Sequence, residues 1–197
     1  MKVVAVEHLT LDGVMQAPGR PDEDRRGGFQ HGGWAQPDND EVMAEAMAEG
    51  MANGGALLFG RRTYEDFAAF WPKQADNPFT AVLNNSQKFV ASRTLKEPLP
   101  WINSTLLKGD AAEAVANLKE KPGKDIVVLG SGVLVQSLMK RNLVDEYVLM
   151  IHPLVLGSGR RLFADDGALA ALRLVDVKTT TKGVIIATYR PSEGKRN

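Results

Sequence analysis

The feature that most constrains the fold is the apolar run 125–129, Asp-Ile-Val-Val-Leu, which is followed directly by Gly130-Ser131-Gly132. A short run rich in β-branched residues is typical of a parallel strand that is covered on both faces. The glycine pair ends this strand and opens a helix that continues through Val135, Leu138 and Met139. A strand, a tight turn and a helix in this order predict an α/β protein.

The rest of the chain alternates in the same way. Apolar runs and amphipathic stretches predict strands at 3–6, 56–59, 88–92, 104–107 and 144–151, and helices at about 40–51, 62–70 and 111–121. Two last strands at 172–177 and 184–189, joined by a Lys182-Gly183 turn, suit an antiparallel hairpin. We therefore expect a single domain over 1–197, with a mostly parallel central sheet, an antiparallel C-terminal edge and helices on both faces.

Two details of the first helix follow from its flanking residues. Asp38, Asn39 or Asp40 is expected to cap its start. Asn53-Gly54-Gly55 is expected to end it with a glycine C-cap.

The composition excludes several classes of protein. Lys and Arg number 24 and Asp and Glu also number 24, so the basic excess of a nucleic-acid binder is missing. Cysteine is absent, which excludes disulfides, Cys-ligated metal and a cysteine nucleophile. The three histidines, His8, His31 and His152, are dispersed, and we interpret them as structural or solvated, with no metal site. Without a signal peptide or a membrane-length apolar run, a soluble cytoplasmic protein is expected.

A loop of about twenty residues, 18–37, is rich in Gly, Pro, Asp and Arg. Loops of this length in a compact domain are usually functional or disordered. Phe29 and Trp34 lie within it, and such aromatic side chains either stack on a flat heterocycle or cover the core.

Three polar clusters follow predicted strands. They are Gly130-Ser131-Gly132, Gly60-Arg61-Arg62-Thr63 and Ser92-Arg93-Thr94. Helix N-termini and guanidinium groups both favour phosphate, and ligands of open α/β sheets bind at the carboxyl edge of the strands. Each cluster alone is explained as well by a surface turn, but three at one edge favour an anionic nucleotide.

Two common nucleotide-binding motifs are not present. The dinucleotide fingerprint G-x-G-x-x-G fails because Val135 stands at its third glycine. Gly55, Gly60 and Arg61 superficially resemble a P-loop, but the Lys-Ser/Thr pair is missing.

The order of these motifs resembles the dihydrofolate reductase superfamily. The matching segments are Leu9-Thr10-Leu11-Asp12-Gly13-Val14, Phe59-Gly60-Arg61-Arg62-Thr63-Tyr64-Glu65, Val90-Ala91-Ser92-Arg93-Thr94 and Val128-Leu129-Gly130-Ser131-Gly132. The later segments Leu143-Val144-Asp145-Glu146-Tyr147 and Ile151-His152-Pro153-Leu154-Val155-Leu156-Gly157-Ser158-Gly159 resemble the C-terminal branch of the riboflavin-biosynthesis reductases. The resemblance covers about residues 2 to 190.

The resemblance implies a three-layer, NADPH-dependent reductase fold. In it, Gly60, Arg61, Arg62 and Thr63 would hold cofactor phosphates, and Ser92 and Arg93 would lie near the 2′-phosphate. Gly130, Ser131, Gly132, Val133 and Leu134 would face the diphosphate and the nicotinamide ribose, with Leu11 and Asp12 beside the nicotinamide.

The substrate and the proton donor are less defined. Asp38, Asp40 and Glu41 lie where the folate enzymes carry an acidic residue, but helix capping explains them as well. Trp34, Met43 and Met47 are candidates for the substrate pocket, with core packing as the alternative.

Taken together, the residues and the resemblance predict an oxidoreductase that transfers a hydride from NADPH to a small heterocyclic or carbonyl substrate. It would resemble 5-amino-6-(5-phosphoribosylamino)uracil reductase or dihydrofolate reductase. The alternative is a nucleotide- or flavin-binding module without turnover. The resemblance also implies a homodimer formed through the sheet edge.

Overall fold

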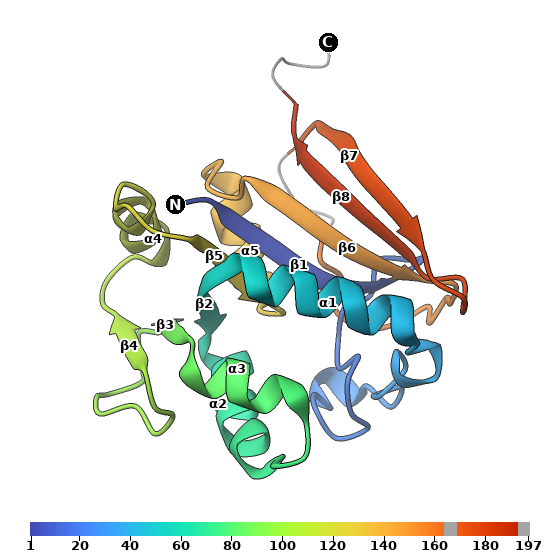
Figure 1. Cartoon of the computed structure of the whole chain (residues 1–197), viewed down its shortest axis with the longest axis horizontal. Helices are drawn as coiled ribbons and strands as arrows, with labels where there is room; N and C mark the ends of the chain where they lie inside the picture. Colours follow the sequence, from blue (N-terminus) through green and yellow to red (C-terminus); the bar gives the residue numbers. More distant parts are fainter. Residues whose placement is uncertain (164–168, 193–197) are drawn as a thin grey trace.

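The computed structural model describes residues 1–163 and 169–192, and its eight strands form one sheet in the order β4-β3-β2-β5-β1-β6-β8-β7 (Figure 1). The strands are β1 (Val3–Thr10), β2 (Gly54–Gly60), β3 (Gln87–Ala91), β4 (Ser104–Leu107), β5 (Asp125–Leu129), β6 (Glu146–His152), β7 (Leu172–Thr179) and β8 (Ile185–Pro191). The helices are α1 (Glu41–Asn53), α2 (Arg61–Phe70), α3 (Pro78–Asn85), α4 (Ala111–Lys119) and α5 (Gly132–Lys140).

The strand directions confirm the predicted sheet. β1 pairs in parallel with β5 and β6, β2 pairs in parallel with β3 and β5, and β3 with β4. β8 is antiparallel to both β6 and β7, which gives the expected antiparallel edge. The carboxyl ends of β1, β2, β3 and β5 therefore meet at one edge of the sheet.

Helices cover both faces of the sheet, as predicted. In β5, Ile126 and Val128 pack into a core with α4 and α5, whereas Val127 and Leu129 pack on the opposite face with residues of α2 and α3. α1 lies across this second face, over β1 and β6, as Figure 1 shows. This alternation is the reason that β5 is apolar at nearly every position.

Some element boundaries differ from the prediction. α3 was not predicted, because eight residues are too few to show a clear helical period. Its start is nonetheless well defined: Pro78 lies in the first turn, and the Asn77 side chain accepts from the backbone N–H of Phe79.

The expected glycine C-cap of α1 is confirmed, because Gly54 is the C-cap and its backbone N–H donates to the backbone oxygen of Gly50. Gly54 has an extended backbone, with φ at −70°, and begins β2. A side chain at Gly54 would meet Val127 at 2.9 Å, and one at Gly55 would meet Lys124 at 2.4 Å. The two glycines therefore allow β2 to approach β5 closely.

The long loop contains two single turns of 3-10 helix, η1 (Arg26–Gly28) and η2 (Gln36–Asp38). It also has a small apolar core, made of Val14, Ala17, Phe29, Trp34 and Ala35. The indole N–H of Trp34 donates to the backbone oxygen of Gln16 over 2.7 Å. Of the two roles considered for Phe29 and Trp34, the structure favours core packing.

No helix in the described ranges is both long enough and apolar enough to cross a bilayer.

The start of α2 is fixed by a buried hydrogen bond. Tyr64 is fully buried, and its hydroxyl oxygen accepts from the backbone N–H of Trp101 over 3.0 Å. Trp101 lies in the connection between β3 and β4, so this bond holds that connection against α2.

We predict that Tyr64→Phe lowers the free energy of unfolding by about 1–3 kcal/mol, because the buried N–H of Trp101 loses its acceptor. Urea denaturation measures the change. Tyr189→Phe is the matched control, since the Tyr189 hydroxyl makes no hydrogen bond with the residues described here. Equal stability of the two variants would contradict a stabilising role for the hydrogen bond between Trp101 and Tyr64.

Candidate active site

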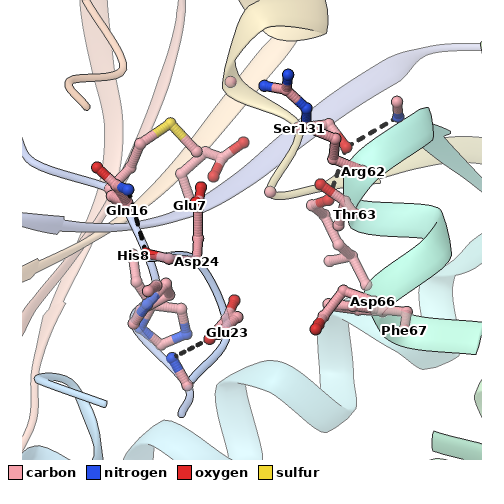
Figure 2. A pocket seen from close by; sticks show the side chains of 18 of the residues that line it. Glu7, His8, Gln16, Glu23, Asp24, Arg62, Thr63, Asp66, Phe67 and Ser131 are labelled. Carbon is pink, nitrogen blue, oxygen red and sulfur yellow. Dashed lines mark hydrogen bonds between the residues drawn. The ribbon is translucent and has the colours of Figure 1, made fainter. Parts of the chain in front are cut away.

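A large cleft, with a volume of about 2250 Å³, opens at the carboxyl edge of the sheet. Figure 2 shows two of its walls. One carries Arg62, Thr63 and Ser131, and the other carries Glu7, His8 and Gln16. The cleft therefore brings together β1, the N-terminal turns of α2 and α5, and the long loop.

The turn between β5 and α5 has an unusual backbone. Gly130 and Ser131 have φ values of 56° and 64°, in the left-handed region that a serine rarely adopts. This conformation directs the Ser131 hydroxyl toward β2, where its oxygen accepts from the backbone N–H of Gly60 over 2.9 Å. One hydrogen bond thus joins the starts of α2 and α5.

The starts of these two helices lack side-chain caps. α1, α3 and α4 are capped by Asp40, Asn77 and Asp110, whose side chains accept from backbone N–H groups of the first turn. No side chain caps α2 or α5 among the described residues. Their first N–H groups are therefore available to an anion, and the helix dipoles favour one there.

Exposed guanidinium groups border the same part of the cleft. Arg61 and Arg62 open α2, and Arg93 follows β3; all three are exposed and line the cleft. Arg61 lies 3.9 Å from Glu65, whereas Arg62 and Arg93 form no ion pair with the part of the chain that the structure describes. Ser92 also lines the cleft, but its hydroxyl oxygen accepts from the backbone N–H groups of Thr94 and Leu95.

The structure brings most of the predicted cofactor residues together. Those that line the cleft are Gly60, Arg61, Arg62, Thr63, Ser92, Arg93, Gly130, Ser131, Gly132, Val133 and Leu134. Their role in binding a cofactor stays a prediction.

Leu11 and Asp12 do not line the cleft. The Asp12 carboxylate accepts from the Thr10 hydroxyl and from the backbone N–H groups of Leu156 and Gly157. These bonds, the first above all, lower the pKa of Asp12 to about 2. Asp12 therefore fastens the turn after β1 to the segment after β6.

The three acidic candidates near α1 occupy different positions. Asp40 lines the cleft, but it accepts from the backbone N–H of Met43 and from the backbone N–H and hydroxyl of Thr181. The hydroxyl bond is the main reason that the pKa of Asp40 falls to about 2. Asp40 is thus an ionised helix cap, and Glu41 is exposed outside the cleft lining.

Asp38 also lies outside the cleft lining, and its carboxylate accepts from Nδ1 of His152 over 2.8 Å. Nε2 of His152 lies 3.0 Å from Nδ1 of His8, which lines the cleft. Sequence reasoning missed this arrangement because three lone histidines far apart in the chain gave no spacing signal.

Of the substrate candidates, Met43 and Met47 line the cleft from α1, and Met43 is also part of the core under that helix. Trp34 does not line the cleft. It lies behind it, with its ring packed edge-on against His152 at 5.2 Å.

Glu7 is a second feature that the sequence did not indicate. It is buried and lines the cleft, and its Oε1 has no hydrogen-bond partner among the described residues. Burial raises the pKa of the Glu7 carboxyl well above its usual range.

The long loop closes one side of the cleft. Arg20 forms an ion pair with Asp66 on α2 at 2.5 Å, and its guanidinium lies 4.2 Å from the centre of the Phe70 ring. These contacts tie the loop to α2 across the cleft.

Comparisons with known proteins agree with this architecture. The family model described as the RibD C-terminal domain matches residues 1–186. The uncharacterized protein YyaP of Bacillus subtilis (strain 168) is 34% identical over 140 residues, which cover 68% of this chain and 72% of YyaP.

Two solved structures have the same fold. A protein provisionally assigned to riboflavin biosynthesis from Shewanella sp. PV-4 has a TM-score of 0.72 and 24% identity, and the match covers 98% of this chain and all of that one. Dihydrofolate reductase from Enterococcus faecalis, solved with NADP(H), has a TM-score of 0.62 and 14% identity, with 98% and 97% of the two chains covered. Because the family model spans nearly all of the sequence, the chain belongs to the RibD C-terminal domain family.

Proposed function

We propose that this protein is a reductase that uses NADPH to transfer a hydride to a small heterocyclic or carbonyl substrate in the cleft. The observation that carries the proposal is the pair of uncapped N-termini of α2 and α5 at the cleft, whereas α1, α3 and α4 each have a side-chain cap. The family relationship supports it, because the RibD and dihydrofolate reductase folds are reductase folds.

The donor groups of the cleft fit a phosphorylated dinucleotide. A diphosphate matches backbone N–H groups at the starts of α2 and α5, where Gly130 and Gly132 leave the backbone accessible. A 2′-phosphate matches a guanidinium group, and Arg62 and Arg93 are the exposed candidates. When bound, NADPH supplies the hydride, and the protein supplies orientation, exclusion of water and a proton.

We predict that Arg93→Gln weakens NADPH binding by about tenfold and leaves NADH binding unchanged, because only NADPH carries the 2′-phosphate. Fluorescence titration with each cofactor measures this. Arg173→Gln, on the exposed edge strand β7, is the matched control. An equal loss for both cofactors would show that Arg93 does not select the 2′-phosphate.

Turnover is tested by following NADPH absorbance with a panel of small lactam heterocycles and carbonyl compounds. We predict oxidation of NADPH above the protein-free rate for at least one class. Tight NADPH binding with no oxidation across the panel would favour the binding module without turnover. Failure to bind NADPH at millimolar concentration would contradict both the cofactor and the reductase.

We also propose that the protein forms a homodimer through β7. This edge strand is exposed over nearly its whole length, and Leu174 and Val177 are 53% and 51% exposed. Apolar side chains on an open edge strand are a typical surface for pairing with a second copy.

Light scattering with size exclusion is expected to give a dimer for the wild type and a monomer for Val177→Lys. Val155→Lys, in an exposed position after β6, is expected to remain dimeric. A wild-type monomer would refute this interface.

A further inference from the structure

Three side chains from separate segments form a hydrogen-bonded chain beside the cleft. Asp38 is the last residue of η2, His152 is the last residue of β6, and His8 lies on β1. The distances are 2.8 Å from Asp38 Oδ2 to His152 Nδ1, and 3.0 Å from His152 Nε2 to His8 Nδ1.

Only one end of this chain reaches the cleft. His152 is fully buried and Asp38 has 23% of its side chain exposed, but neither lines the cleft, whereas His8 does. A proton held on His152 can therefore pass to a ligand in the cleft only through His8.

The middle ring is held firmly in place. His8 pairs with Met150 in the parallel register of β1 and β6, so His152, two residues further along, lies on the same face of the sheet. Trp34 packs edge-on against His152, and its own indole N–H is fixed by the backbone of Gln16. The His152 ring therefore cannot turn away from His8 without disturbing this packing.

The imidazole rings of His8 and His152 have different electrostatic surroundings. Burial, and to a smaller extent repulsion from His152, lowers the pKa of His8 to about 3, so His8 is neutral near pH 7. Nδ1 of His152, in contrast, lies 2.8 Å from Oδ2 of Asp38, so these two groups hold a proton between them. When His152 is protonated, both of its nitrogens donate, so His8 accepts at Nδ1 and carries its own proton on Nε2.

We propose that the Asp38–His152 pair stores the proton that the reduction consumes, and that His8 delivers it to the substrate. This inference rests on the proposed reductase function. It makes His8 the catalytic acid, with His152 and Asp38 as positioning residues that act through it.

The N–H bond at His8 Nε2 breaks and its proton joins the oxygen or nitrogen of the C=O or C=N bond, while His8 Nδ1 takes the proton from His152 Nε2. The carbon of the same bond receives a hydride from the reduced nicotinamide, and the π electron pair forms the new bond to hydrogen at the heteroatom. His152 becomes neutral, and water in the emptied cleft reprotonates the pair through His8.

Two titratable groups adjoin the relay in sequence. Glu7, next to His8 in sequence, points to the opposite face of the strand, and Asp40, two residues after Asp38, is held ionised by Thr181. Glu7 is the rival proton source, because it is also buried at the cleft.

The first test needs neither cofactor nor substrate. Nitrogen-15 NMR of the histidine rings in the full chain follows both side chains with pH. We expect His8 to switch from Nε2–H to Nδ1–H when His152 loses its proton, and Asp38→Asn to move this switch to a lower pH. A His8 tautomer that never changes, or a switch that Asp38→Asn leaves in place, would overturn the proposal.

The second test uses turnover with any substrate found in the NADPH assay. We expect His8→Gln and Asp38→Asn to reduce kcat by about a hundredfold, with NADPH affinity within twofold of the wild type. In Asp38→Asn the loss of activity at high pH should begin at a lower pH. His31→Gln, at an exposed position outside the cleft, is the control.

The variants also separate this inference from the proposed function. If Glu7→Gln removes the loss of activity at high pH and Asp38→Asn leaves it at the wild-type pH, Glu7 is the donor and the relay is overturned. If the wild type does not bind NADPH, the proposed function fails, while the NMR result still decides whether the relay exists. Thermal unfolding of each variant shows whether a loss of activity is a loss of folding.

Discussion

The contact on which the site depends is the hydrogen bond from the backbone N–H of Gly60 to the hydroxyl oxygen of Ser131. It joins two turns that parallel pairing of β2 and β5 has already brought to the same edge of the sheet. As a result, α2 and α5 begin side by side, and their unpaired N–H groups face one cleft. The left-handed backbone at Ser131 is the strained element that makes this possible, and such strain is common at functional sites.

The cleft then divides into two chemically different walls. The wall of α2 and α5 presents N–H groups and guanidinium groups, and it is suited to phosphates (Figure 2). The wall of β1 presents an uncharged imidazole at His8 and, at Glu7, a buried carboxyl whose pKa is raised by burial. In the proposed reductase, phosphate binding and proton transfer would therefore take place on opposite walls of the cleft.

The sequence predicts the sheet well because strands and turns are indicated by residues that are neighbours in the chain. The apolar run in β5 and the turn at Lys182-Gly183 depend only on neighbouring residues, and the parallel core and the antiparallel edge follow from them. The convergence of the clusters at Arg61, Arg93 and Gly130 also follows, since parallel strands share a carboxyl edge.

The features that were missed depend on distant residues. His8 and His152 are in contact although 144 residues separate them in the sequence, and Asp38 and His152 are separated by 114. No spacing rule connects them, so they were interpreted as separate structural or capping residues. Trp34 likewise could not be assigned until the small core of the long loop was visible.

We propose that the joined starts of α2 and α5 bind the phosphates of NADPH. Titration of the nitrogen-15 labelled protein with NADPH, followed by amide chemical shifts, is the measurement that decides this. We predict the largest shifts at the backbone N–H groups of Arg62, Gly132 and Val133. Shifts confined to other surfaces, or none at saturating NADPH, would contradict it.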